Sequence, residues 1–137
     1  MIPIAAFVVK KVSSQSNVSD NPAVPIDYKI PEREAPLKGA AYKGKMMFMQ
    51  KCAACHNPFK DGTGPSILGF EQRGTWGDRQ NLYAWIRNPA EFMKRDPYTR
   101  ALKEKFGSMM TGFPDITDEE IDNIVAFLNL LAKQRGY

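Results

Sequence analysis

The sequence predicts an all-α fold, with one small helical domain that follows an N-terminal extension rich in proline. Two amphipathic helical segments and the absence of a convincing alternating strand pattern support this prediction. The chain has 137 residues, of which 43% are hydrophobic and 25% charged, and its net charge is +4. This composition is typical of one globular domain and excludes a wholly disordered or repetitive chain. The longest apolar run, residues 2–9, is shorter than the roughly 20 residues of a membrane-spanning helix.

The first 37 residues are expected to form an extended tail or linker, or the stub of a membrane anchor. Five of the ten prolines of the chain lie here: Pro3, Pro22, Pro25, Pro31 and Pro36. The segment is also rich in Ser, Asn and Asp and shows neither helical nor alternating periodicity, as is typical of a linker. Residues 38–137 are then expected to form the folded domain.

Three helices are expected in this domain before the C-terminal one. The first begins between residues 37 and 41. The second covers Asp78–Arg87 and ends at Asn88–Pro89, because the residue before a proline disfavours the helical conformation. A further short helix covers Tyr98–Phe106. The expected loops, which are rich in glycine, are residues 57–76 and 107–112.

The C-terminal helix has the most complete sequence signals. Thr117 is a typical N-cap residue, and Glu120 three positions later completes a capping box. Ile116 precedes the cap and can pack on Ile121 as a hydrophobic staple. Acidic residues in the first turn and basic residues in the last turn complement the helix dipole. The expected apolar stripe is Ile121, Ile124, Val125, Phe127, Leu128 and Leu131.

The two cysteines and the single histidine of the chain form one motif, Cys52-Ala-Ala-Cys55-His56. Random placement of three such residues gives C-x-x-C-H with a chance of roughly one in ten thousand, and this pattern is the attachment signature of c-type haem. On a helical turn, residues at i and i+3 project to one side, so Cys52 and Cys55 can form thioethers to the two vinyl groups of one porphyrin. The imidazole of His56 can then bind the iron as the proximal ligand.

Other uses of the two cysteines fit the sequence less well. A thioredoxin-like dithiol needs a preceding strand, and residues 40–60 show no strand pattern. A zinc site needs about four ligands and an iron–sulfur cluster needs four thiolates. The chain has only two cysteines and one histidine. A disulfide across three residues is possible but closes too short a loop to stabilise the fold much.

Residues 38–134 resemble the class I c-type cytochromes, the small monohaem electron carriers of bacterial periplasms and mitochondria. The C-x-x-C-H motif follows a helix that contains Gly44 and Phe48, which is similar to the N-terminal helix of that family. The resemblance implies a small cytochrome c fold in which the N- and C-terminal helices pack crosswise around one covalently bound haem c. Phe127 would be the aromatic partner of Phe48. A helix-interior glycine costs about 1 kcal/mol, so Gly44 indicates either close backbone approach or a simple weak point.

The resemblance also implies roles for residues beyond the motif. Gly64-Pro65 looks like the loop of the family whose proline carbonyl accepts the hydrogen bond from the proximal imidazole, which assigns that role to Pro65. Arg73 lies where the family commonly has an arginine near the haem propionates. Trp76 is the favoured indole donor to the same groups, with Trp85 as the alternative. Trp85 also shares a helix face with Leu82 and Ile86, which is the spacing of a core residue, so packing is the stronger explanation of its position.

Met110 is the expected second axial ligand, so that His56 and Met110 would both bind the iron. The family has a methionine followed by x-x-Phe and a capped acidic helix, and residues 110–120 fit this pattern. Met109 is the alternative. The other methionines of the domain are expected to be core residues on helices: Met46, Met47, Met49 and Met93. The connection between Pro89 and Met110 is longer than in many family members and is expected to hold an extra helical turn or two.

These assignments imply one-electron transfer in a respiratory or photosynthetic chain, by a soluble or complex-associated carrier, and no enzymatic activity of the chain itself. The expected partners are redox proteins, namely a quinol-oxidising complex and a terminal oxidase, and the tail could instead hold the chain in a membrane complex. The rival hypothesis is a haem enzyme or gas sensor with an open distal site. The resemblance implies export, to the periplasm or the outer face of the cytoplasmic membrane, although residues 1–9 make a poor signal peptide.

The charge distribution offers a docking hypothesis. Residues 40–110 carry 12 basic and 6 acidic side chains, a net +6, whereas residues 111–137 carry 2 and 5, a net −3. No motif supports binding to nucleic acid. Either ordinary solvation or steering of an acidic partner explains the basic residues. The basic residues that could surround the haem edge, which we call the basic ring, are Lys43, Lys45, Lys51, Lys60, Arg73 and Lys94.

Overall fold

The structure is a computed structural model that describes residues 38–137, and this part of the chain is helical without strands. The expected tail, residues 1–37, lies outside the described residues. In order, the elements are α1 (Gly39–Lys51), the short 3-10 helix η1 (Phe70–Gln72), α2 (Arg79–Arg87), α3 (Pro89–Arg95), α4 (Pro97–Phe106) and α5 (Asp118–Gln134). The all-α prediction is confirmed. No helix within residues 38–137 is both long enough and apolar enough to cross a bilayer.

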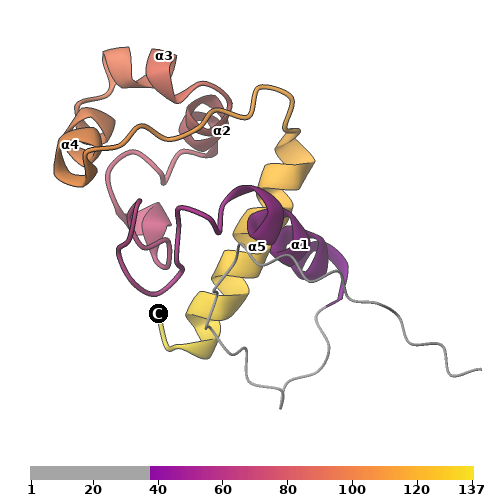
Figure 1. Ribbon diagram of the computed structural model, residues 1–137. Helices are drawn as coiled ribbons and strands as arrows, with labels where there is room; N and C mark the ends of the chain where they lie inside the picture. Colours follow the sequence, from indigo (N-terminus) through magenta and orange to yellow (C-terminus); the bar gives the residue numbers. More distant parts are fainter. Residues whose placement is uncertain (1–37) are drawn as a thin grey trace, which may run out of the picture.

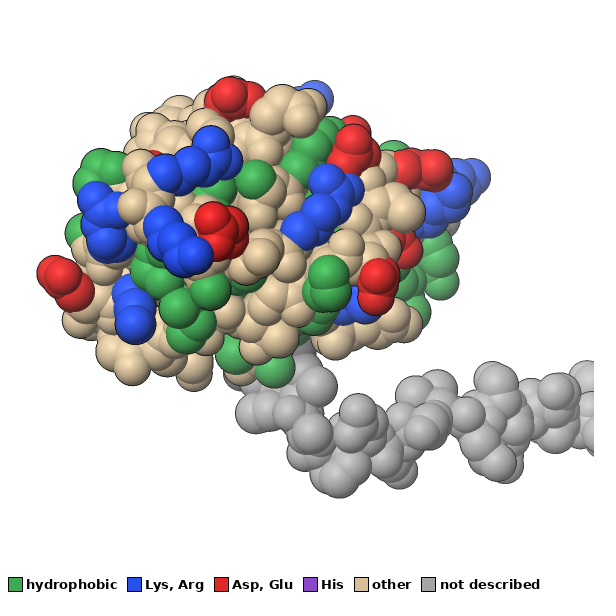
Figure 2. Space-filling model, turned by 90° about the horizontal axis from the view of Figure 1, so that it is seen from above, with side chains coloured by type: hydrophobic (Ala, Val, Ile, Leu, Met, Phe, Trp, Pro, Cys, Tyr) green, Lys and Arg blue, Asp and Glu red, His purple; other side chains and the backbone are tan. Residues whose placement is uncertain are grey.

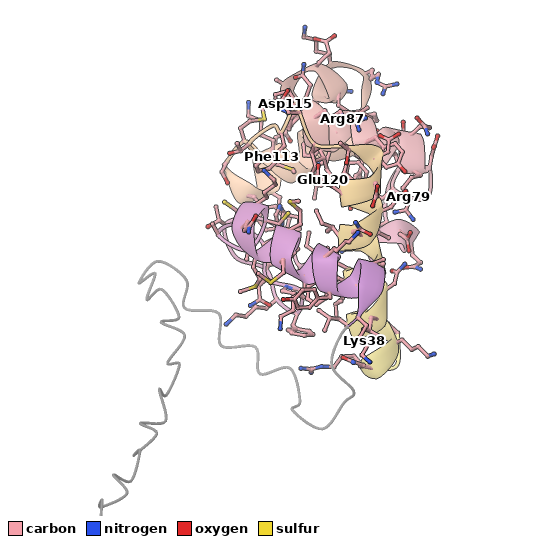
Figure 3. The ribbon with its side chains drawn as sticks, turned by 90° about the vertical axis from the view of Figure 1, so that its right-hand side faces the viewer. Lys38, Arg79, Arg87, Phe113, Asp115 and Glu120 are labelled. Atoms are coloured by element: carbon pink, nitrogen blue, oxygen red, sulfur yellow. The ribbon has the colours of Figure 1, made fainter. Side chains whose placement is uncertain are left out.

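The N- and C-terminal helices, α1 and α5, cross each other and form the centre of the fold (Figures 1 and 3). Gly44 of α1 lies directly against the backbone of α5, where an added Cβ atom would be 1.7 Å from the carbonyl oxygen of Asn123. One turn later, the buried rings of Phe48 and Phe127 are tilted against each other with centroids 5.8 Å apart. The close-approach explanation of Gly44 is therefore confirmed, as is the crosswise packing.

The start of α5 is held by its expected cap. The hydroxyl of Thr117 accepts a hydrogen bond from the backbone N–H of Glu120 at 3.1 Å, and the Glu120 carboxylate accepts one from the Thr117 N–H at 2.8 Å. Arg87 of α2 pairs with Asp118 and donates from Nε to the carbonyl of Ile116, which fixes α2 beside this end of α5 (Figure 3). All six residues of the predicted apolar stripe are buried: Ile121, Ile124, Val125, Phe127, Leu128 and Leu131.

Helices α2, α3 and α4 lie together on one side of the crossed pair (Figure 1). The prediction that Asn88–Pro89 only ends a helix is incomplete, because the same two residues also start α3. The Asn88 side chain caps the backbone N–H of Glu91, and Pro89 occupies the first helical turn. Asp96 repeats this arrangement at the start of α4. Proline cannot continue a helix but suits its first turn, so one dipeptide marks both events.

A polar cluster joins α2 to α5 and to η1. The guanidinium of Arg79 pairs with Glu71 at 3.1 Å and with Asp122 at 3.6 Å. The Tyr83 hydroxyl donates to the same Asp122 carboxylate at 2.8 Å. These contacts hold α2 in place, and α2 forms one wall of a cavity.

Candidate functional site

A cavity of about 300 Å³ lies between the crossed helices and the α2–α4 layer. Side chains from α1, η1, α2, α4 and α5 line it, together with the loop after His56 and the loop before α5. Most of its wall is apolar, and it includes the buried residues Phe48, Ile121 and Leu128. All seven residues that the sequence singled out line this one cavity: Cys52, Cys55, His56, Pro65, Arg73, Trp76 and Met110.

The two cysteines and the histidine are placed by the turn that ends α1. Cys52 is the C-cap of α1, and its carbonyl accepts hydrogen bonds from the backbone N–H groups of Cys55 at 3.2 Å and His56 at 2.9 Å. The two cysteines are free thiols rather than a disulfide. Burial raises the pKa of the Cys52 thiol to about 12, against a smaller opposing effect of Lys51. Dithiol redox chemistry needs a lowered thiol pKa, so this site does not suit it.

The imidazole of His56 is oriented by Pro65. The distance from His56 Nδ1 to the Pro65 carbonyl oxygen is 2.9 Å. A carbonyl can only accept, so Nδ1 carries the proton and Nε2 presents its lone pair. Burial lowers the pKa of His56 below its usual value, and the Pro65 hydrogen bond opposes this only partly. The imidazole is therefore neutral at pH 7, as a metal ligand must be.

Gly64 leaves room for this ring. A Cβ atom at Gly64 would lie 2.6 Å from Cε1 and 2.9 Å from Nδ1 of His56, so a larger residue would displace the imidazole. The same glycine donates its backbone N–H to the Cys55 carbonyl at 2.8 Å. The Gly-Pro loop thus both contacts and orients the histidine.

Arg73 and Trp76 form the wall beside η1. Arg73 Nη2 donates to the carbonyls of Ser66 at 2.7 Å and Leu68 at 3.3 Å, while its buried Nε has no partner within residues 38–137. An unpaired buried donor is costly, and an anionic group in the cavity would satisfy it. Trp76 is buried against Trp85, with ring centroids 5.7 Å apart, and both rings line the cavity.

The loop before α5 supplies two methionines to the cavity. Met110 is half-buried, whereas Met109 is 44% exposed at the cavity edge. The end of this loop is fixed to α2 by the hydrogen bond from the Phe113 N–H to the Ile86 carbonyl at 2.9 Å. None of the four methionines assigned to the core lines the cavity: Met46, Met47, Met49 and Met93. Met46 is 44% exposed, so its assignment to the core was wrong.

Helix α4 was expected as Tyr98–Phe106, but its position as a wall of the cavity was not. Tyr98, Leu102, Lys103 and Phe106 all line the cavity. The ring of Tyr98 lies against Gly74, where an added Cβ would be only 2.3 Å from it. The apolar spacing of Tyr98, Leu102 and Phe106 was a local signal, but the position of these residues over the cavity depends on packing between segments distant in sequence.

The proposed basic ring is only partly present at the cavity. Of its six members within residues 38–137, Lys51 and Arg73 line the cavity. Lys43 pairs instead with Glu119, and Lys94 pairs with Glu91 inside α3. Lys103, which the sequence analysis did not include, lies at the cavity as well.

The donor set and the cavity fit a haem c. Two free cysteines, one oriented neutral histidine and one methionine line a largely apolar cavity, and a buried arginine donor lacks an acceptor there. These features define a small c-type haem protein. Residues 41–132 match the family model of cytochrome c, and the chain belongs to the cytochrome c family. Haem-based electron transfer is the function that this family supports.

Two solved structures share the fold, and one longer protein is similar to the chain in sequence. The fold is similar to that of cytochrome c from Rhodothermus marinus, with 24% identity, a TM-score of 0.60, and coverage of 76% of this chain and 90% of that one. An engineered form of the same cytochrome gives 23% identity, a TM-score of 0.57, and coverage of 75% and 90%. Cytochrome c oxidase subunit 2 of Alkalihalophilus pseudofirmus is 30% identical to the chain over 108 residues. The match covers 73% of this chain but only 28% of the length of that longer relative.

Proposed function

We propose that this chain carries single electrons on one haem c, which Cys52 and Cys55 would hold through thioether bonds and whose iron His56 and Met110 would bind. The observation that carries the proposal is the His56–Pro65 hydrogen bond inside a cavity that Met110 also lines. It leaves Nε2 of the neutral imidazole available for iron. The second ligand then comes from the loop before α5.

The residues around the cavity suit electron transfer. When bound, the haem supplies an iron that alternates between the ferrous and ferric states. Two protein ligands leave no open coordination position, so binding of a substrate at iron is disfavoured. The thioether of Met110 is a weak donor that favours ferrous iron and raises the reduction potential. Apolar walls from residues such as Phe48, Ile121 and Leu128 exclude water and act in the same direction.

A terminal oxidase is the electron acceptor that we favour. The similarity to cytochrome c oxidase subunit 2 of A. pseudofirmus supports this acceptor. Lys51 and Lys103 lie at the cavity, and Met109 is exposed at its edge, so a partner surface with acidic groups would fit here. Figure 2 views the face on which α3 lies. Several basic side chains and fewer acidic ones lie in the left part of this face. We propose a quinol-oxidising complex as the donor, and the periplasm or the outer face of the cytoplasmic membrane as the location of the chain.

A fixed subunit of a membrane respiratory complex is the second candidate. The observation that favours it is again the likeness to an oxidase subunit, since there a related segment is part of a longer subunit chain. In this arrangement residues 1–37 would attach the domain to the complex. Co-purification of the full chain with an oxidase in detergent supports the fixed subunit, whereas recovery of the cytochrome in the soluble fraction supports the carrier.

The reduction potential tests the axial ligands. We expect Met110→Ala to lower the potential by roughly 100 mV or more, because water or an external ligand replaces the thioether. Met109→Ala is the matched control and should change it by less than about 20 mV, since that side chain is largely exposed. Ferrous Met110→Ala should also bind carbon monoxide, which the natural protein should not. A large shift with Met109→Ala alone would reassign the ligand, and carbon monoxide binding by the natural protein would favour the open-site enzyme or sensor.

A further inference from the structure

Two contacts join the loop after His56 to the end of α4. Lys105 Nζ lies 3.2 Å from Asp61 Oδ2, and Ser108 Oγ donates to the Thr63 carbonyl at 3.1 Å. The paired residues are 44 and 45 positions apart in the sequence. We call these four residues the clasp. Both contacts bridge the same two segments, so each supports the geometry of the other.

The clasp lies at the edge of the cavity, since Thr63 and Ser108 both line it. Ser108 is only two residues before Met110. At the other end of this loop, Phe113 donates its N–H to the Ile86 carbonyl. Between these points, no backbone hydrogen bond ties residues 109–112 to the described part of the chain. We call residues 108–113 the methionine loop. This loop is thus attached by hydrogen bonds at its two ends, and the clasp is one of these attachments.

The other side of the clasp leads directly to the proximal histidine. Asp61 Oδ1 accepts the backbone N–H of Ser66 at 2.9 Å. Ser66 follows Pro65, whose carbonyl accepts the His56 hydrogen bond. The N–H of Ser66, followed by Lys105, holds the pKa of Asp61 below its usual value, so the carboxylate is charged at neutral pH. The clasp therefore connects the segment that orients one axial ligand to the segment that supplies the other.

We propose that the clasp holds the methionine loop closed over the cavity, with Lys105 and Ser108 as positioning residues that act through Met110. This inference rests on the proposed function, in which Met110 binds iron. An external ligand must displace the Met110 thioether, and displacement requires the loop to move away. Each clasp contact stabilises the closed loop, so its loss raises the population of the open loop and the apparent affinity for an external ligand.

The test is imidazole binding to the ferric holoprotein, followed by absorption spectroscopy. Loss of one hydrogen bond should make Ser108→Ala bind imidazole roughly fivefold more tightly. An exposed ion pair contributes less, so Lys105→Met should show a roughly twofold effect that disappears in about 1 M salt. Lys94→Met is the matched control, because it removes another exposed ion pair, with Glu91, that lies within α3 and joins no loops; its side chains are 73% and 64% exposed, against 64% and 49% for Lys105 and Asp61. The control should leave imidazole affinity unchanged.

Two further measurements separate loop opening from general loss of stability. Ser108→Thr and Lys105→Arg keep the donors and should restore the natural imidazole affinity. Hydrogen exchange of the peptide 107–113 should become faster in Ser108→Ala, while the melting temperature changes by at most a few degrees. General destabilisation would instead accelerate exchange throughout α5 and would overturn the proposal.

The proposed function and the clasp fail in different ways. If the natural protein shows methionine–iron absorption, and Ser108→Ala binds imidazole with the natural affinity, the clasp proposal is overturned while the ligand assignment stands. If the natural ferric protein lacks methionine–iron absorption altogether, both are overturned. A tighter affinity in both Ser108→Ala and Lys94→Met would also overturn the clasp, because the effect would not depend on joining the two loops.

Discussion

The crossing of α1 and α5 depends on the absence of a side chain at Gly44. A Cβ atom there would lie 1.7 Å from the Asn123 carbonyl oxygen, 2.3 Å from its carbon and 2.8 Å from the Ile124 nitrogen. These are backbone atoms of a helix, so no side chain can rotate away. Ordinary contact begins at about 3.4 Å, so Gly44→Ala must separate the helices by more than 1 Å and weaken the packing of Phe48 on Phe127.

The expected cost of Gly44→Ala follows from opposing effects. Overpacking typically costs 1–3 kcal/mol, and loss of the aromatic contact costs about 1 kcal/mol more. Alanine returns about 1 kcal/mol through its higher helix propensity. We expect a net loss of about 2 kcal/mol in the free energy of unfolding, measured by denaturant titration of the holoprotein with circular dichroism.

A control variant separates the close approach from a general effect of replacing glycine. Gly62→Ala should change the free energy of unfolding by less than about 0.5 kcal/mol, because nothing lies within 4 Å of an added Cβ there. If Gly44→Ala stabilises the protein by about 1 kcal/mol, propensity alone governs the position. That result would refute the close approach of the two helices.

Three further predictions concern the cap, the cavity wall and the clasp. Thr117→Ala should lower the free energy of unfolding by about 1 kcal/mol in denaturant titration, since it breaks the capping box with Glu120, and an unchanged value would contradict the cap. Arg73→Gln should lower the reduction potential by roughly 40 mV, about 1 kcal/mol, because loss of a positive charge favours ferric iron; a higher potential would contradict its place beside the haem. The lowered pKa of Asp61 means that its contribution to stability is present above its usual pKa and is lost as the pH falls through the lowered value. The melting temperatures of the natural protein and Lys105→Met should therefore differ at pH 7 and converge in acid, and a difference that persists at low pH would refute the ion pair.

Local signals in the sequence were sufficient for α5, whereas the crossing with α1 was implied by the family resemblance and Gly44 alone left a weak point as the alternative. A capping box and an apolar stripe are encoded within one helix, so Thr117 and Glu120 could be assigned without knowledge of the fold. Gly44 was informative because glycine is unfavourable inside a helix unless a close contact requires it. The C-x-x-C-H motif was equally local, since one helical turn brings Cys52, Cys55 and His56 together.

The wall formed by α4 could not be predicted in the same way. Helix α4 itself was predicted as Tyr98–Phe106, but α3 was missed, because Asn88–Pro89 was interpreted only as the end of α2 although it also starts α3. The position of Tyr98 over the cavity depends on its contact with Gly74, which lies 24 residues earlier in the chain. Likewise, the basic ring was inferred from the distribution of charge along the sequence. In the structure, Lys43 and Lys94 instead form ion pairs with nearby acidic residues.

An absorption spectrum of the protein, produced together with haem-maturation machinery, tests the central claim most directly. The account predicts a sharp α band in the reduced form, and in the oxidised form the weak long-wavelength band of a methionine–ferric iron bond. The band should disappear in Met110→Ala and persist in Met109→Ala, and the haem should stay with the polypeptide after denaturation. A high-spin oxidised spectrum without this band, or haem that separates from the denatured chain, would contradict the account.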